Sequence, residues 1–176
     1  SELEKSGFAF FGVKNGMDGL VKENPAKDII PVTEEMAKIL PFAPSCEFGS
    51  TRRSLIPDPN DPETKIVLKN IRENFGGLVI IGGNDHLYEA TKLAELLDLI
   101  GIPCLVVGVP KTIDADLCYT LPLGAQSAAQ VILEEVYRAA ALPHSQEVVI
   151  VEPMGRLCGY LTARGGDIRP EEVKKL

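Results

Sequence analysis

The sequence predicts an α/β fold: a three-layer sandwich built on a mostly parallel sheet. From residue 75 onward, short and continuously apolar runs rich in β-branched residues alternate with longer segments of helical period. Strands that are apolar on both faces are typical of a parallel sheet with helices on both sides. The length of 176 residues fits about one domain. We expect it to cover residues 1–164, with a polar tail or short helix over 165–176.

Three strands are expected in the second half, over residues 77–81, 103–109 and 148–151, because each run is short and apolar. The segment 86–100 carries an apolar stripe at helical spacing, and Gly101 follows it as a C-cap glycine. The segment 125–141 is rich in Ala, Leu and Glu, which predicts a second helix.

The first half is less regular. Residues 8–13 are expected to form a strand, and residues 33–40 a helix with Thr33 as N-cap. The proline-rich stretch 41–62 predicts a loop. Residues 63–74 combine an apolar stripe with an acidic first turn, which indicates a helix.

Composition excludes several classes of protein. The chain has 25 acidic and 18 basic side chains and a net charge of -7, which argues against nucleic acid as a partner. We expect no membrane association, because glycine, proline or charge interrupts every apolar run and the N-terminal residues are charged. The 4 cysteines are widely spaced, which favours reduced thiols and a cytoplasmic protein.

Ligands of open parallel sheets bind beyond the carboxyl ends of the strands. After the first expected strand, Gly82 and Gly83 would let backbone amides approach a phosphate closely. The alternative is an ordinary strand–helix turn with Asp85 as N-cap. After the third, Gly155 permits a tight turn and Arg156 could fork onto a phosphate. The alternative there is a surface ion pair.

The segment after the second expected strand holds a cation, a hydroxyl and two carboxylates: Lys111, Thr112, Asp114 and Asp116. Phosphoryl transfer needs a cation against the phosphate oxygens and a carboxylate that takes the proton of the acceptor hydroxyl. Because the flanking sequence is apolar, we favour this function over a solvated polar loop.

The motifs GGNDH (82–86), PKTIDAD (110–116) and EPMGRLCG (152–159), with GSTR (49–52) before them, resemble those of the phosphofructokinase family. The resemblance runs from about Phe8 to Ala163. It implies a Rossmann-like domain, covering part of the family's chain, that transfers a phosphoryl group to the 1-hydroxyl of fructose 6-phosphate in glycolysis. It also implies Mg²⁺ as cofactor and a homo-oligomer.

Site residues follow from the resemblance by motif position. Asp114 would be the general base, supported by Asp116. The expected catalytic residues are Lys111, Thr112, Asp114, Asp116 and Arg156. The donor phosphates would be bound by Arg52, Gly82, Gly83, Asp85 and Lys111, and fructose 6-phosphate by Thr112, Asp114, Met154, Gly155 and Arg156. The expected metal ligands are Asn84 and Asp116.

The donor is expected to be pyrophosphate, with ATP as the alternative. Members of the family that use pyrophosphate resemble this chain in having Asp and Lys at the positions of Asp85 and Lys111. A carboxylate at Asp85 would exclude the α-phosphate of a nucleotide by bulk and charge, whereas Lys111 suits a compact polyanion.

Several positions depart from the family pattern. Asn84 stands where the family has a metal-binding aspartate, and an amide is a poorer ligand for Mg²⁺ than a carboxylate. His86, Ala115 and Glu147 also differ. A degenerate or regulatory phosphate-binding subunit is therefore the alternative function, and a domain for some other anion is a third. We expect the 176 residues alone to be weakly active or inactive, since other phosphate-binding segments of the family have no counterpart in this sequence.

Overall fold

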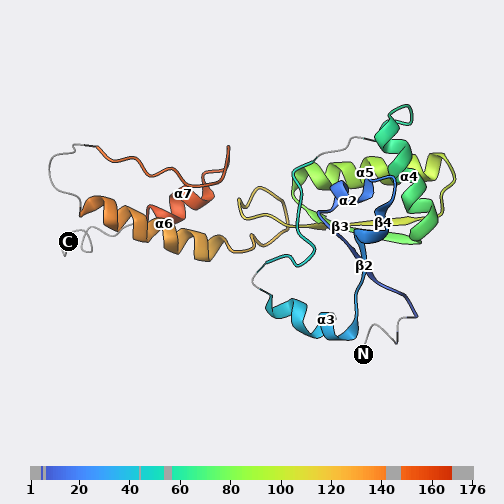
Figure 1. The fold of residues 1–176 in the computed structure, drawn as a ribbon. Helices are drawn as coiled ribbons and strands as arrows, with labels where there is room; N and C mark the ends of the chain where they lie inside the picture. The colour runs from blue at the N-terminus through green and yellow to red at the C-terminus, as the bar shows by residue number, and fades with distance from the viewer. Residues whose placement is uncertain (1–4, 6, 44, 54–56, 142–147, 168–176) are drawn as a thin grey trace. The chain divides into compact units, whose positions relative to one another are not determined.

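The computed structural model describes residues 5, 7–43, 45–53, 57–141 and 148–167. The chain divides into two compact units (Figure 1). Unit 1 comprises Ser1–Ile80 and Asp85–Gly108, and unit 2 comprises Ile81–Asn84 and Val109–Leu176. The expected division into 1–164 and 165–176 stays a prediction, and residues 168–176 lie outside the described part.

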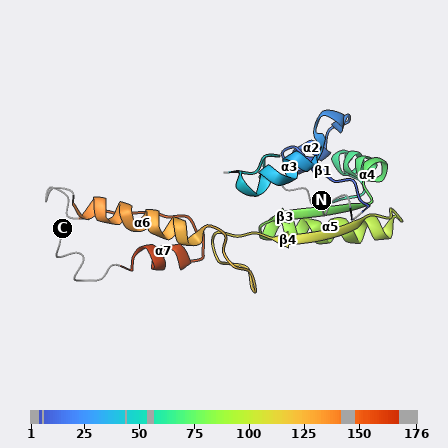
Figure 2. The same cartoon turned by 90° about the horizontal axis from the view of Figure 1, so that it is seen from below.

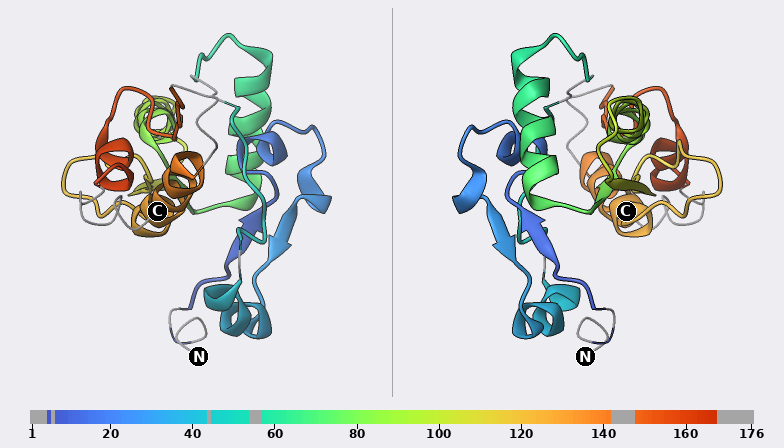
Figure 3. Two further views of the ribbon diagram at one scale, coloured as in Figure 1. Left: turned by 90° about the vertical axis from the view of Figure 1, so that its left-hand side faces the viewer. Right: turned by 90° about the vertical axis from the view of Figure 1, so that its right-hand side faces the viewer.

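Unit 1 begins with an antiparallel pair of short strands, β1 (Phe11–Val13) and β2 (Ile29–Pro31), which Figure 3 shows side by side. Only the last three residues of the strand expected over 8–13 are in β1, and β2 was not expected. The connection contains helix α2 (Met17–Leu20) and the 3₁₀ turn η1 (Pro25–Lys27). These elements are shorter than the window over which apolar periodicity can be read.

Two helices of unit 1 begin at side-chain caps, of which Thr33 was predicted and Asp61 was not. In α3 (Glu34–Ile39), the Thr33 hydroxyl accepts a hydrogen bond from the Met36 amide at 3.2 Å. In α4 (Pro62–Asn74), the Asp61 carboxylate accepts one from the Thr64 amide at 2.8 Å. Such side chains satisfy amides that the first turn of a helix leaves unpaired. The 3₁₀ turn η2 (Leu40–Phe42) follows α3, and the described residues from 43 to 61 form the expected loop, which ends one residue earlier than predicted because Pro62 begins α4.

Strands β3 (Gly77–Gly82) and β4 (Leu105–Pro110) form the expected parallel pair, and α5 (Asn84–Leu99) connects them. The Leu105 amide donates to the Gly76 carbonyl, and the Lys111 amide donates to the Gly82 carbonyl. The separation in sequence between donor and acceptor is the same at both ends, as expected for parallel strands. Gly101, at a φ of +69°, ends the helical segment as expected.

The core of unit 1 lies between the sheet, α4 and α5, and Figure 2 shows α5 running alongside β3 and β4. It is built from Val67, Ile71, Leu78, Leu93 and Leu97 together with Leu20 and Ile102. The other face of the sheet is exposed over Val79, Leu105 and Val107. Helices were expected on both faces. Within the described residues of unit 1, helices cover only one face of the sheet.

Unit 2 contains α6 (Ala125–Ala140) and α7 (Tyr160–Gly165), which lie side by side (Figure 1). Gly165 meets Ile132 so closely that an added Cβ would lie 2.4 Å from the isoleucine Cγ2. Helix α6 was expected, whereas α7 was not.

The strand expected over 148–151 is wrong. These residues have no regular structure, and Val148 and Ile150 are 77% and 85% exposed. A β-branched run favours extended backbone, but a strand also needs the edge of a neighbour for its hydrogen bonds. Within the described residues of unit 2, no strand pairs with this run.

All four cysteines are free thiols, with Cys46 and Cys118 exposed and Cys104 and Cys158 partly buried. Burial raises the pKa of the Cys104 thiol, since a low-dielectric surrounding disfavours the thiolate. In the described part of the chain, no helix has both the length and the apolar character to span a membrane.

Candidate active site

The loop after β4 is organised around Thr112, which is only 5% exposed. The Thr112 hydroxyl donates to Asp116 Oδ1 at 2.6 Å and accepts from the Asp114 amide at 3.1 Å. Ala115 lies between the two aspartates with a φ of +60°. That left-handed conformation costs an alanine about 1–2 kcal/mol. The hydrogen bonds of Thr112 hold the tight turn that brings Asp116 back to it.

Asp114 has one carboxylate oxygen that is unusual in the structure. Oδ1 is buried and has no hydrogen-bond partner among the residues that the structure describes. Buried polar atoms are nearly always satisfied, so an orphaned carboxylate oxygen needs an explanation. This oxygen has an unused acceptor site, which a general base needs, and a substrate hydroxyl would reach it only after a local movement that uncovers it.

The glycine turn after β3 lies against this loop. The Lys111 amide donates to the Gly82 carbonyl at 2.9 Å. A Cβ on Gly83 would lie 3.8 Å from the Lys111 carbonyl oxygen, so the two backbones are close neighbours. The Asn84 side-chain amide donates to Asp116 Oδ2 at 2.9 Å. The structure therefore brings together the residues predicted at the first two strand ends.

The Asn84–Asp116 contact bears on the expected metal site. Both oxygens of Asp116 accept a hydrogen bond, from Thr112 and from Asn84. The Asn84 amide turns its NH₂ group, and not its oxygen, toward the carboxylate. A cation chelated by this pair would need an oxygen ligand from each of the two residues. The pair as arranged does not fit a chelating Mg²⁺ site, and no group of three or more His, Cys, Asp or Glu that could hold a metal occurs among the described residues.

The segment 154–156 forms the tight turn that the sequence indicated. Gly155 has a φ of +134°, and a Cβ there would lie 2.5 Å from the Cys158 carbonyl oxygen, so only glycine fits. Met154 and Arg156 are exposed. Within the described residues, no hydrogen bond or ion pair joins this turn to Lys111–Asp116. The expected convergence of Arg156 with that loop stays a prediction.

The cationic groups predicted to bind phosphate are uncommitted. Lys111 and Arg156 in unit 2 and Arg52 in unit 1 are exposed, and none makes an ion pair within the described part of the chain. Asp85 lies inside the first turn of α5, which begins at Asn84, so the alternative of Asp85 as its N-cap is wrong.

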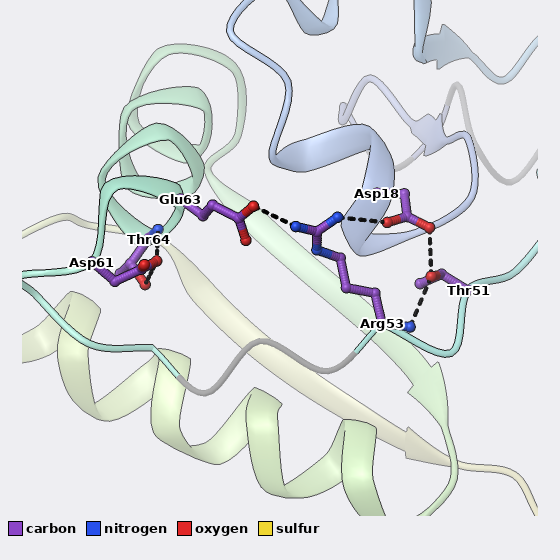
Figure 4. A network of polar contacts seen from close by, with 6 residues as sticks. All are labelled: Asp18, Thr51, Arg53, Asp61, Glu63 and Thr64. Carbon is purple, nitrogen blue, oxygen red and sulfur yellow. Dashed lines mark hydrogen bonds and ion pairs between the residues drawn. The ribbon is translucent and has the colours of Figure 1, made fainter.

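A polar network beside Arg52 was not expected from the sequence. In unit 1, Arg53 bridges Asp18 of α2 and Glu63 of α4, and Thr51 joins the same carboxylate of Asp18 (Figure 4). The adjacent arginines Arg52 and Arg53 were the only sign of this network in the sequence, and the sequence alone does not tell which of the two forms ion pairs.

These observations define an α/β domain with hydroxyl, carboxylate and glycine groups gathered at the ends of two parallel strands. The family model described as phosphofructokinase matches residues 2–168. The chain belongs to the phosphofructokinase family, as its motifs predicted.

Relatives of both donor types are similar to the chain. It is 34% identical over 158 residues to the pyrophosphate–fructose 6-phosphate 1-phosphotransferase of Dictyoglomus thermophilum, covering 88% of this chain and 42% of the relative. It is 36% identical over 162 residues to an ATP-dependent 6-phosphofructokinase of Yersinia pestis, covering 89% and 46%. The chain therefore spans less than half the length of these relatives.

Solved structures agree in fold. The pyrophosphate-dependent phosphofructokinase from Nitrosospira multiformis matches with a TM-score of 0.72 and 27% identity, over 93% of this chain and 42% of that one. The enzyme of the same description from Marinobacter aquaeolei matches with a TM-score of 0.68 and 29% identity, over 90% of this chain and 40% of that one. The predicted fold class is thereby confirmed.

Proposed function

We propose that this chain is the part of a phosphofructokinase that carries the general base for phosphoryl transfer from pyrophosphate to the 1-hydroxyl of fructose 6-phosphate. The buried, unpartnered Oδ1 of Asp114 is the observation that carries the proposal. A carboxylate held in a rigid turn with one free acceptor site is ready to receive a hydroxyl proton. Family membership supplies the reaction class.

In the proposed reaction, Asp114 accepts the proton of the 1-hydroxyl of fructose 6-phosphate. The oxygen of that hydroxyl attacks a phosphorus atom of pyrophosphate at the same time. The bond from that phosphorus to the bridging oxygen breaks, and inorganic phosphate leaves. Thr112 holds the turn, while Lys111, Arg52 and Arg156 bind phosphate oxygens. Gly82 and Gly83 let the backbone amides approach the phosphates of the donor, and Met154 and Gly155 line the sugar site.

Magnesium enters this proposal as part of the substrate. Because the Asn84–Asp116 pair does not fit a chelating site, we propose that Mg²⁺ arrives bound to the donor polyanion. Such an ion usually keeps several waters and is held largely by phosphate oxygens. We place the enzyme in the cytoplasm and expect a homo-oligomer, by analogy with the family.

Pyrophosphate is favoured over ATP by two charges. Asp85 is exposed in the first turn of α5, where a bulky nucleotide would meet its carboxylate. Lys111 is exposed and makes no ion pair with another described residue, which suits a small, highly charged donor. Relatives with either donor resemble the chain, so these two residues carry the choice.

The test measures turnover of fructose 6-phosphate by the full-length protein with Mg²⁺ and either pyrophosphate or ATP. We expect kcat/KM with pyrophosphate to exceed that with ATP by at least about tenfold, equivalent to ~1.4 kcal/mol. A preference for ATP would contradict the donor assignment, and no turnover with either donor would contradict the enzyme.

The second candidate is a regulatory or degenerate subunit that binds phosphates without turning over. The Asn84–Asp116 hydrogen bond favours it, because it occupies a carboxylate oxygen that a metal would otherwise use. The variant Asn84→Asp separates the two functions.

For a working enzyme, we expect Asn84→Asp to lower turnover by about tenfold, since two facing carboxylates repel and disturb the turn that holds Asp114. The readout is kcat with pyrophosphate, and Asn84→Ala is the control that removes the hydrogen bond without adding charge. A rise of two orders of magnitude or more would favour the degenerate subunit, whose site lacks a metal ligand.

A further inference from the structure

The network beside Arg52 joins three segments of unit 1 (Figure 4). Arg53 Nη1 donates to Asp18 Oδ1 at 3.2 Å, and Arg53 Nη2 donates to Glu63 Oε1 at 2.5 Å. The Thr51 hydroxyl donates to Asp18 Oδ2 at 2.6 Å and accepts from the Arg53 amide at 2.9 Å. The four side chains therefore connect the segment 51–53 to α2 and to the first turn of α4.

The geometry depends on the forked shape of arginine. Each terminal nitrogen of the guanidinium binds a carboxylate on a different helix, which a lysine ammonium cannot reproduce with fixed directions. The Thr51 hydrogen bond and the Arg53 charge lower the pKa of Asp18, and Glu63 and Asp18 raise the pKa of Arg53. The stabilisation from Asp18 is present above its ordinary pKa of 3.8 and is lost as the pH falls through the lower folded value.

Backbone contacts hold the same segment from the other side. The Asn15 amide donates to the Phe48 carbonyl at 2.7 Å. The Phe48 ring packs so tightly on Gly12 that a Cβ there would lie 2.2 Å from it. Gly49 turns at a φ of +74° beside the Asn15 side chain. The chain is therefore anchored both before and after Arg52.

Arg52 itself takes no part in the network. It is exposed, it makes no ion pair in the described part of the chain, and both its neighbours are engaged with α2. We propose that Asp18, Thr51, Arg53 and Glu63 form a positioning clamp that holds the backbone so that Arg52 is presented to the phosphates of the donor. The inference rests on the proposed function, in which Arg52 binds the donor.

The clamp acts by preorganisation. A loop that is ordered before the ligand arrives loses less conformational freedom on binding, and affinity rises accordingly. Breaking the clamp should weaken donor binding through Arg52 and leave fructose 6-phosphate binding unchanged. Lost stability alone would have no such selectivity.

A double-mutant cycle tests the clamp. The dissociation constant of inorganic pyrophosphate is measured by calorimetry for the full-length protein and for Arg52→Ala, Arg53→Gln and the double variant. We expect Arg52→Ala to weaken binding by about 10- to 100-fold, as for the loss of a charge-assisted hydrogen bond. Arg53→Gln should weaken it by about three- to tenfold, and by nothing further in the Arg52→Ala background.

The matched control is Arg138→Gln, which removes an arginine paired with Glu135 on its own helix and should leave pyrophosphate affinity unchanged. Arg53→Lys should recover only part of the lost affinity. Equal losses from Arg53→Gln in both backgrounds, or no loss, would overturn the clamp even in an active enzyme. A protein that binds pyrophosphate with the expected coupling but does not turn over would overturn the proposed function alone, and absence of pyrophosphate binding would overturn both.

Discussion

Asp114→Asn is expected to lower kcat for phosphoryl transfer by about 10²–10⁴-fold, the range that positioned general bases contribute. The amide has the size of the carboxylate but cannot take a proton from the sugar hydroxyl. The backbone amide of Asp114 still donates to the Thr112 hydroxyl, so the turn should keep its shape. The KM for fructose 6-phosphate should change little, because the proton is transferred only as the transition state forms.

The measurement is steady-state turnover with pyrophosphate, with Asp98→Asn as the control. Asp98 is an exposed aspartate of α5 that belongs to no predicted site, and its replacement should leave kcat unchanged. An Asp114→Asn variant that retained more than about a tenth of wild-type kcat would show that the reaction does not use this carboxylate as its base.

Ile71→Ala is expected to lower the free energy of unfolding by about 2–5 kcal/mol. Ile71 of α4 is 0% exposed and belongs to the core cluster that contains Leu78 of β3 and Leu97 of α5. Truncation removes buried methyl groups and leaves a cavity that close-packed neighbours only partly fill. Since domains are stable by about 5–15 kcal/mol, this loss is a large share of the total.

Urea denaturation followed by circular dichroism measures the effect as a shift of the midpoint. Ile39→Ala is the matched control, because the same side chain on α3 is 66% exposed. Ile71→Val should fall between the two, at about 0.5–1.5 kcal/mol. Equal losses for Ile71→Ala and Ile39→Ala would contradict the placement of the core.

Helices α3, α4 and α5 could be predicted because their signals are local, whereas the short α2 was not expected. Thr33 was predicted as an N-cap and accepts a hydrogen bond from the amide three residues on. Asp61 caps α4 through the same spacing, although the sequence analysis did not name it. Gly101 ends its helical segment because only its own φ matters. The strands were less certain, since a β-branched run such as 148–151 becomes a strand only if another chain segment supplies a pairing edge.

In the candidate site, too, some features follow from the local sequence and others depend on contacts between distant residues. Motif spacing located Thr112, Asp114 and Asp116 at the end of β4, where chain order and strand direction decide the position. It did not reveal that Asn84 directs its amide toward Asp116, because that contact joins residues far apart in the sequence. The metal pair was expected from residue type alone and stays a prediction, and the orientation of the Asn84 amide is what tertiary structure adds.

By itself, the sequence determined the family of this protein, its local caps and turns, and the chemical groups at its strand ends. All of these depend on residue type and on separations of a few residues. Only the tertiary structure decided that Arg53 is paired and Arg52 free, that Asp116 is already hydrogen-bonded, and that one oxygen of Asp114 is buried without a partner. The physical reason is that hydrogen bonding and burial depend on neighbours brought together by folding, and those neighbours are distant along the chain.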